Sequence, residues 1–570
     1  MKKILFVLCF ALCVLSAGAE AKKPATANEE EMLRLTRELM ADCSEGQLPN
    51  GLTLNEDSTL SINLKVFLAD PEAKRYFEQI GKLMMADQAA ANNSEIEIGD
   101  IQIKDIPQEN TDSTVALPAN LRRDVSLPMF TYYLAVPYTY MSVDGKNNPV
   151  RLSSILYRPS PFQWNWTADR GLLSHFVFDL GIATVVLEAF KGLWNWAFGY
   201  TFDYGVLDCH PTVTTSKQAP TGSDPLDGPI SMFCSDYAIV VCPDYCGYGL
   251  SEYRQHPYLV QGITARNVVD GYIAALDLIR DNKAIDASGS WSLASDFHTD
   301  IIGYSQGGSV ALATLRYLES GQVSDEQLKR INLRYTYCGD GPYSPIATVN
   351  QYVEWSNRDE DKYKYMAYPC VLPLIVQAAK EAYNGDCMHT VEVSSYFTTK
   401  FLDTGILDKL DSKRVSTDQI NEVTTAAGTR TIDEIMSDRM IVKKTDPETG
   451  KQINALNTES NEYKCLMRAL DYNDLTKGWE PRHPLLFLHL DGDLVVPYCN
   501  MEEVQHNLAP KAHAKMVFTT PEKVKGMLSP VWSFAQWYKD CMANPDHGSI
   551  GQFFFIAAAS GAFEKLLKAN

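Results

Sequence analysis

Three short apolar runs and an intervening helical pattern constrain the fold of this chain more than any other feature. The runs are YGVLDCH (204–210), YAIVVCPDY (237–245) and DIIGYS (300–305). Between the second and the third lies TARNVVDGYIAALDLIRDN (264–282), whose apolar residues recur at the three- and four-residue spacing of a helix. Because strands that alternate with helices are typical of crossover units, the sequence predicts a mainly parallel sheet.

Further strand candidates flank this central region. The runs FTYYLAVPYTYMSVDG (130–145) and NPVRLSSILYRP (148–159) meet at the turn sequence DGKNN, which predicts an antiparallel hairpin leading into the sheet. A largely helical block covers about 346–477, and PLLFLHL (484–490) and AKMVFTT (514–520) follow it. A helical block between two strands of one sheet is interpreted as a cap.

The first residues have the layout of a secretory signal peptide. Met1–Lys3 supplies two lysines, Ile4–Leu15 is apolar, and small residues follow at Ala17 and Ala19. We therefore exclude 1–21 from the fold and expect the protein to be secreted or periplasmic, with attachment to the outer surface left open.

The rest of the chain divides by composition. A length of 570 residues fits one large domain with insertions and an extension. The expected parts are a polar N-terminal extension (22–125), the first part of the core (126–345), a hydrophobic insert within it (160–204), the helical cap (346–478) and the second part of the core (479–570).

The centre of the insert, 171–202, is apolar on nearly every side. Three charged residues and a histidine interrupt it, namely His175, Asp179, Glu188 and Lys191. No uncharged span of about 18 residues therefore exists for a membrane crossing, and the sequence predicts no transmembrane span in the mature chain. The segment is interpreted as buried helices or as a lid over an apolar substrate site.

Charge and cysteine usage exclude some classes of protein. The formal net charge of −20 argues against a nucleic-acid partner and against anionic membrane surfaces. Eleven scattered cysteines follow residue 21. Cys242 and Cys246 have no second ligand pair at zinc-site spacing, so we expect buried thiols or a disulfide there and no metal.

The pentapeptide Gly303-Tyr304-Ser305-Gln306-Gly307 matches the G-x-S-x-G pattern of a nucleophilic serine on a tight turn. Such a turn brings backbone segments close together, so the residues two before and two after the serine must be small. A strand candidate precedes the motif and a helix candidate follows it, as the pattern requires. The alternative is a glycine-rich helix start with an incidental serine.

A serine hydroxyl needs a general base, and the base needs a carboxylate to orient it. The apolar run in HPLLFLHLDGDLVVP (483–497) ends in an acidic turn, where Asp491 and Asp493 are both candidates. Of the ten histidines, His547 alone lies beyond the last strand candidate, in a loop signal followed by an apolar helix. We expect it to be presented to the serine.

An acyl-transfer reaction also needs two backbone N–H groups aimed at the developing oxyanion. One is expected from Gln306, directly after the serine. The segment LDCHPTVTT (207–215) is the candidate for the other. Because Pro211 has no N–H group, Thr212 is the expected second donor.

Together these segments resemble the α/β-hydrolase superfamily, and within it secreted bacterial esterases and lipases related to the secretory lipase family. PDYCGYGLSEYRQHPYL (243–259) is similar to a segment that those proteins carry after a central strand. WEPRHPLLFLHLDGDLVVP (479–497) resembles their Trp-x-Pro and His-Gly-x-x-Asp-x-x-Val-Pro signature, which puts Asp493 at the acid position. Leu490 and Pro211 stand where the family has glycine.

The resemblance implies an α/β-hydrolase fold and a secreted serine hydrolase that cleaves carboxylic esters of lipids or other apolar acyl groups. The implied catalytic order is Ser305, Asp493, His547, and no cofactor or metal is implied. Two alternatives stay open at this point: a peptidase of the same fold, and a non-catalytic binding protein on a hydrolase scaffold.

Overall fold

The computed structural model describes residues 131–159, 200–223, 238–280, 291–528 and 542–569. It also describes four short strands nearer the N-terminus: β1 (Leu52–Leu54), β2 (Leu60–Ile62), β3 (Val115–Ala116) and β4 (Arg123–Leu127). The predicted signal peptide and most of the predicted extension and hydrophobic insert lie outside the described residues.

A ten-stranded sheet organises the described part of the chain, in the order β14-β13-β10-β9-β7-β8-β6-β5-β3 with β4 paired to β5. In this order, each pair of neighbours from β14 to β8 is parallel. The pairs that involve β5 or β6 are antiparallel. The main strands are β5 (Thr131–Val143), β6 (Pro149–Pro159), β7 (Tyr200–Cys209), β8 (Ile239–Pro243), β9 (Trp291–Tyr304), β10 (Leu333–Gly339), β13 (Leu485–Leu488) and β14 (Met516–Thr519). The predicted, mainly parallel sheet is confirmed.

The expected hairpin is formed by β5 and β6, and its turn is held by a buried carboxylate. Asp144 Oδ1 accepts hydrogen bonds from the backbone N–H groups of Lys146, at 3.0 Å, and Asn148, at 2.9 Å. Asn147 has φ 65°, a left-handed conformation that asparagine tolerates better than most residues. The turn chemistry read from DGKNN therefore fixes where the two strands pair.

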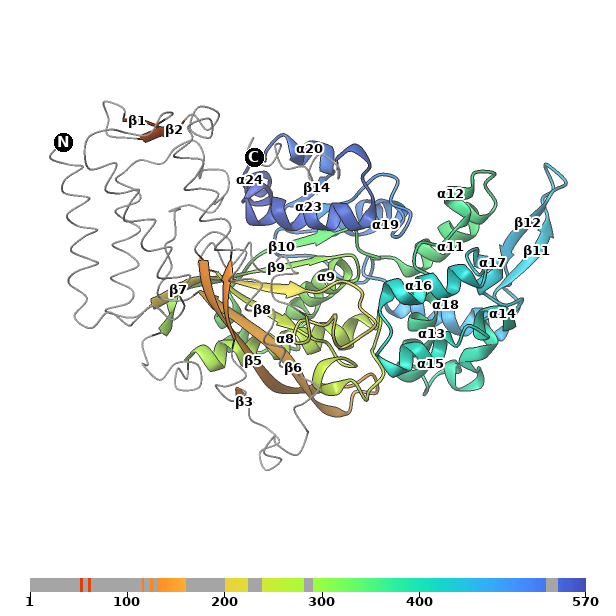
Figure 1. The fold of residues 1–570 in the computed structure, drawn as a ribbon, viewed down its shortest axis with the longest axis horizontal. Helices are drawn as coiled ribbons and strands as arrows, with labels where there is room; N and C mark the ends of the chain where they lie inside the picture. Colours follow the sequence, from red (N-terminus) through yellow and green to blue (C-terminus); the bar gives the residue numbers. More distant parts are fainter. Residues whose placement is uncertain are drawn as a thin grey trace, which may run out of the picture.

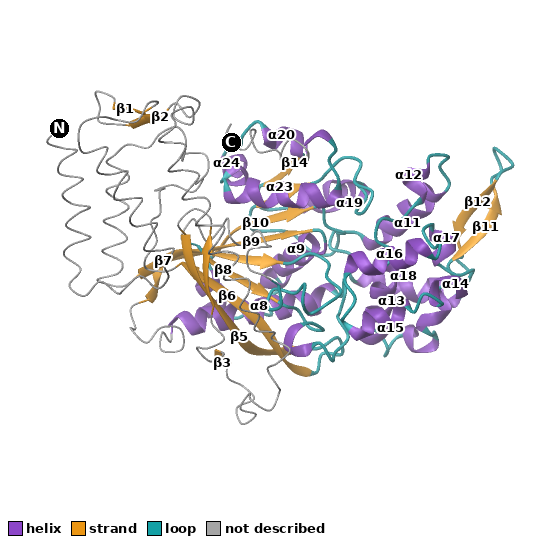
Figure 2. Ribbon diagram, in the orientation of Figure 1, coloured by secondary structure: helices purple, strands orange, loops and turns teal. Residues whose placement is uncertain are grey.

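Helices cover both faces of the sheet (Figure 1, Figure 2). On one face α8 (Gln261–Arg280) and α9 (Gln306–Glu319) share an apolar core with the strands. On the other face α23 (His547–Ala559) and α24 (Ala562–Lys568) do the same. Each large apolar side chain that these layers bury contributes about 1.5–3 kcal/mol. Short helices complete the core: α10 (Asp325–Ile331), α19 (Cys499–Glu503), α20 (Pro521–Lys525), η4 (Gly249–Ser251), η7 (Val504–Leu508) and η8 (Ala509–Lys511).

A second, mostly helical body with its own apolar core follows β10. Its elements are α11 (Pro345–Ser356), α12 (Asp361–Lys364), α13 (Val371–Ala382), η5 (Cys387–Thr390), η6 (Val393–Tyr396), α14 (Thr399–Leu402), α15 (Ile406–Ser412), α16 (Thr417–Ala426), α17 (Ile432–Ile435) and α18 (Asn461–Tyr472). It also contains a hairpin of β11 (Ile441–Thr445) and β12 (Gln452–Leu456), which the sequence reading took for helix. A disulfide between Cys387 and Cys465 ties η5 to α18.

This helical body contacts loops at the carboxyl edge of the sheet, beyond which it lies in Figure 1. The Tyr352 hydroxyl of α11 donates to the carbonyl of Val495, in the loop after β13. Thr214 Oγ1, in the loop after β7, donates to the carbonyl of Val415 at 2.8 Å. The helical body therefore stands over the loops that end the parallel strands, where the sequence expected a cap.

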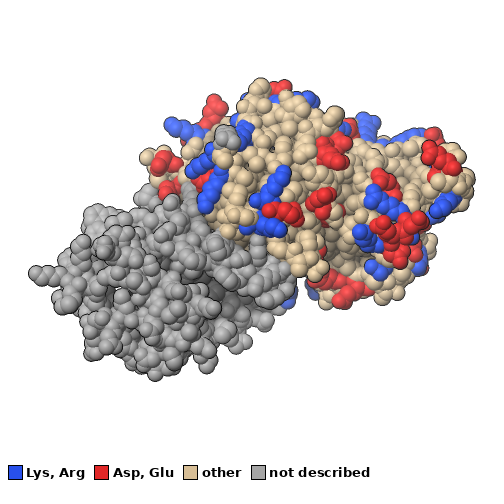
Figure 3. Space-filling model, turned by 90° about the horizontal axis from the view of Figure 1, so that it is seen from above, with Lys and Arg blue, Asp and Glu red and all other residues tan. Residues whose placement is uncertain are grey.

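The described surface carries both signs of charge. On the face shown in Figure 3, basic and acidic side chains are interspersed. Within the described ranges no single helix has the length and hydropathy of a membrane span; α23 and α24, which meet at a 63° bend, reach that composition only when they are counted together.

Candidate active site

Ser305 lies in the tight turn between β9 and α9, as the sequence predicts. Its backbone has φ 58° and ψ −125°, a conformation that residues other than glycine rarely adopt. Its N–H donates to the carbonyl of Gly339, at the end of the neighbouring strand β10, at 2.9 Å. The serine is therefore held at the carboxyl edge of the sheet, at the N-terminus of α9.

The two glycines of the motif make this turn possible. A Cβ atom at Gly303 would lie 2.1 Å from the carbonyl oxygen of Gly307, and a Cβ atom at Gly307 would lie 1.8 Å from the carbonyl oxygen of Cys209. Neither position leaves room for a side chain. The second contact also shows that the loop after β7 packs directly against the start of α9.

His547 connects the serine to a carboxylate. Its Nε2 lies 2.8 Å from Ser305 Oγ and its Nδ1 lies 2.6 Å from Asp493 Oδ2. All three side chains are buried, and they come from the turn after β9, the loop after β13 and the first residue of α23. The arrangement lets the imidazole accept the hydroxyl proton at Nε2 while its Nδ1–H donates to the carboxylate.

The loop after β13 places Asp493, and not Asp491, beside His547. Asp493 Oδ1 accepts hydrogen bonds from the N–H groups of Val495, at 2.7 Å, and Val496, at 3.0 Å. Its other oxygen therefore faces His547. Asp491, the second candidate from the sequence, is exposed to solvent on the same turn.

Electrostatics in the site favour a charged pair. Burial alone raises the pKa of Asp493, but the charge of His547 and the hydrogen bond from it outweigh that effect and hold the pKa below the usual value. Burial alone lowers the pKa of His547, but the charge and the hydrogen bond of Asp493 raise it above the usual value. Asp493 thus stays ionised and makes His547 a stronger base.

Gln306 is anchored through its side chain. Burial lowers the pKa of His256 well below its usual value, so this imidazole stays neutral. Its Nδ1–H donates to the carbonyl of Cys246 at 2.8 Å, which leaves Nε2 to accept from Gln306 Nε2 at 2.9 Å. Gln306 begins α9, where a backbone N–H has no partner within the helix and is free to bind an anion.

Thr212 lies in the loop that packs against Gly307, and its hydroxyl is 2.9 Å from the hydroxyl of Tyr258. The structure therefore brings the neighbourhood of Thr212 to the start of α9. That the N–H group of Thr212 points at the oxyanion stays a prediction.

Sequence reasoning missed a second set of buried polar residues behind Asp493. Asp340 follows β10, His489 follows β13 and Tyr304 precedes the serine. Tyr304 and His489 lie within the two motifs, but the sequence predicted no role for any of the three. At Leu490, where the family has glycine, the structure accommodates the larger side chain in the core, and the backbone N–H donates to Asp340 Oδ1 at 2.7 Å.

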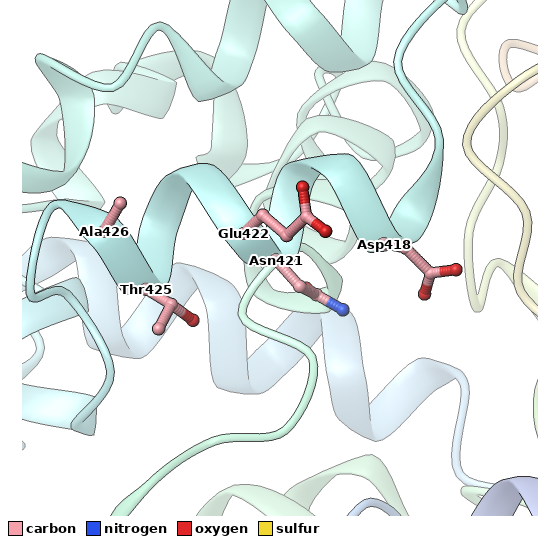
Figure 4. A pocket seen from close by; sticks show the side chains of 5 residues that line it. All are labelled: Asp418, Asn421, Glu422, Thr425 and Ala426. Atoms are coloured by element: carbon pink, nitrogen blue, oxygen red, sulfur yellow. The ribbon is translucent and has the colours of Figure 1, made fainter.

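Three other places in the described part of the chain were candidates for a ligand or a metal. Asp340, His489 and Asp493 have ligand atoms within 4.8 Å of one another. Both oxygens of Asp493 are already engaged, so a cation there would displace His547, and we assign no metal to it. Cys242 and Cys246 are buried, and neither forms a disulfide among the described residues. A surface pocket on α16, lined by Asp418, Asn421, Glu422, Thr425 and Ala426, contains no nucleophile and base pair (Figure 4).

Comparison with known proteins supports the fold. No protein-family model matches the chain, and no curated protein matches it. A solved structure of the rice cell wall degrading esterase LipA from Xanthomonas oryzae has a TM-score of 0.52 at 16% identity, over 80% of this chain and 98% of that chain. A Legionella pneumophila protein has a TM-score of 0.50 at 13% identity, over 80% of this chain and 98% of that chain. Candida antarctica lipase A has a TM-score of 0.41 at 14% identity, over 77% and 86%. With the strand order above, the first two likenesses confirm the α/β-hydrolase fold.

The close contact at Gly307 yields a stability prediction. We expect Gly307→Ala to lower the free energy of unfolding by roughly 1–3 kcal/mol or more, because the new methyl group clashes with a backbone carbonyl that cannot move away. Gly262→Ala is the matched control, since Gly262 is also the second residue of its helix but has nothing within 4 Å of an added Cβ. Thermal melting of both variants checks this; equal melting temperatures would contradict it.

The charge of Asp493 yields a prediction for His547. In Asp493→Asn the imidazole loses its negative partner, so we expect the pKa of His547 to fall and the proton to leave at a lower pH than in the natural protein. An NMR titration of the histidine resonances measures this. Asp491→Asn, on the same turn but exposed, is expected to leave the pKa of His547 where it was.

Proposed function

We propose that this chain is a secreted serine hydrolase that cleaves carboxylic esters. The observation that carries the proposal is the position of His547, whose two ring nitrogens lie within hydrogen-bond distance of Ser305 and Asp493. The α/β-hydrolase fold and the esterase activity of LipA from Xanthomonas oryzae support it.

The reaction follows from this geometry. His547 Nε2 takes the proton of the Ser305 hydroxyl as Oγ attacks the carbonyl carbon of the ester. The backbone N–H groups of Gln306 and Thr212 stabilise the negative charge that develops on the carbonyl oxygen. The imidazolium then gives its proton to the departing alcohol, which leaves an acyl group on Ser305. Water, deprotonated by the same histidine, attacks the acyl-enzyme and releases the carboxylic acid.

Two features favour an apolar ester outside the cytoplasm. The strongly apolar segment 171–202 suits contact with a lipid or another apolar acyl group. The disulfide between Cys387 and Cys465 is typical of proteins in oxidising compartments. The signal-like N-terminus of the sequence favours the same location.

The nucleophile is tested by Ser305→Ala. We expect the variant to lose hydrolysis of nitrophenyl esters and labelling by a fluorophosphonate probe, because the Ser305 hydroxyl is the group that attacks the carbonyl in the proposed reaction. Ser309→Ala is the matched control, since Ser309 lies one turn further along α9 and its hydroxyl donates to the carbonyl of Gln306. Labelling that survives in Ser305→Ala would refute the assignment, and cleavage of peptidyl nitroanilides without ester cleavage would favour a peptidase.

The second oxyanion donor is tested at Thr212. Thr212→Pro removes the N–H group, and the expected loss is about 100- to 1000-fold in kcat with little change in KM. Thr212→Ala keeps the N–H group and removes only the hydroxyl bond to Tyr258, so its kcat should stay far closer to that of the natural enzyme. Steady-state kinetics on a nitrophenyl ester measure both. A folded Thr212→Pro variant with the kcat of Thr212→Ala would exclude this donor.

A further inference from the structure

The hydroxyl group of Tyr304 lies between two oxygen atoms that both act as acceptors in their usual forms. It is 2.5 Å from Asp340 Oδ2 and 2.6 Å from the main-chain carbonyl oxygen of His547. All three residues are buried, so water is not needed to account for either contact. Both distances are those of short O–H···O hydrogen bonds.

A tyrosine hydroxyl has one hydrogen, so it can donate to only one of these two oxygens. The carbonyl of His547 has no hydrogen to give. The second bond therefore needs a hydrogen on Asp340, and a protonated carboxyl group supplies it. In that arrangement Asp340 donates to Tyr304, and Tyr304 donates to the carbonyl of His547.

The surroundings of Asp340 are compatible with a protonated carboxyl group. Its Oδ1 accepts from the N–H of Leu490 at 2.7 Å, which leaves Oδ2 to hold the hydrogen. His489 donates from Nε2 to the carbonyl of Val496 at 3.0 Å, and its Nδ1 lies 3.5 Å from Asp340 Oδ1. This Nδ1 atom has no hydrogen-bond partner among the described residues.

Charged and titratable groups reach Asp340 from several elements. They are His489 and Asp493 from the loop after β13, His547 from α23, Tyr304 from β9 and Tyr343 from the loop after β10. Burial and the charge of Asp493 raise the pKa of Asp340, and together they outweigh the two histidines. A neutral Asp340 also leaves Asp493 as the carboxylate that binds the imidazole of His547 directly.

Tyr304 joins the two halves of the site mechanically. It precedes Ser305 in the turn, and its ring packs against α23, where a Cβ atom at Gly551 would lie 2.9 Å from the ring. Its ring centroid is 5.1 Å from that of His547. A bond from this tyrosine to the carbonyl of His547 thus ties the start of α23 to the serine turn.

We propose that Asp340 is a positioning residue that keeps its proton and, through Tyr304, holds the backbone of His547 so that the imidazole faces Ser305. This role rests on the proposed function. It is a hydrogen-bond chain that orients the base, and its protons are not consumed in the reaction.

The test compares Tyr304→Phe, Asp340→Asn and Tyr343→Phe in the full-length protein. Tyr304→Phe breaks the chain without altering the backbone and is expected to lower kcat about tenfold with little change in KM, the effect of one lost hydrogen bond on an oriented group. Tyr343→Phe is the matched control, because the Tyr343 hydroxyl is also buried beside the site but does not take part in the hydrogen bonds that join Asp340, Tyr304 and His547. Its kcat is expected to match that of the natural enzyme.

The Asp340→Asn variant distinguishes between a protonated carboxyl group and a carboxylate at this position. The amide keeps a donor toward Tyr304 and an acceptor for Leu490, and asparagine tolerates the φ of 37° at this position. We expect a kcat within about threefold of the natural enzyme, well above that of Tyr304→Phe. In the natural enzyme kcat should fall at alkaline pH as Asp340 loses its proton, and this fall should be absent in Asp340→Asn.

Three outcomes overturn the proposal: a folded Asp340→Asn variant that loses as much kcat as Tyr304→Phe, a folded Tyr304→Phe variant with natural kcat, or an alkaline fall that persists in Asp340→Asn. A second measurement does not depend on catalysis. The infrared difference spectrum between the natural protein and Asp340→Asn at neutral pH should contain the C=O stretch of a protonated carboxyl group, and a carboxylate band instead overturns the proposal. If Ser305 proves not to be the nucleophile, the proposed function fails but the spectrum still decides the state of Asp340.

Discussion

The close packing of backbone around Ser305 is the constraint on which the rest of the structure depends. The serine has φ 58°, and the positions two before and two after it leave no room for a Cβ atom. The turn is this tight because the carbonyl of Cys209, the last residue of β7, lies against Gly307. One contact thus joins the serine to the start of α9 and to the loop that holds Thr212.

The sequence predicts features that depend on local chemistry. The serine turn, the DGKNN hairpin and α8 each follow from residues within about 20 positions of one another, and the structure contains all three. Asp493 was preferred over Asp491 by a resemblance, and the structure brings Asp493 to His547 while Asp491 faces solvent. The pattern also predicted a largely helical block over about 346–477, and within it β11 and β12 form a hairpin that the sequence analysis did not identify.

The unpredicted features depend on contacts between distant parts of the chain. Tyr304 meets the carbonyl of His547 across 243 positions, and Leu490 meets Asp340 across 150. His256 reaches Gln306 across 50 positions through a neutral imidazole. Single buried tyrosine, aspartate and histidine residues have no spacing rule that marks them, and their protonation depends on burial that only the folded chain creates. The site is therefore larger than its three motif residues.

The central claim is that Ser305 is a nucleophile, and the site of covalent modification tests it most directly. After reaction of the natural protein with a fluorophosphonate, tryptic digestion yields a peptide from Ala284 to Arg316 that contains Ser305 among several serines. Tandem mass spectrometry can then assign the modified residue. The account predicts a single adduct on Ser305. An adduct on any other residue, or no adduct on a folded protein, would contradict it.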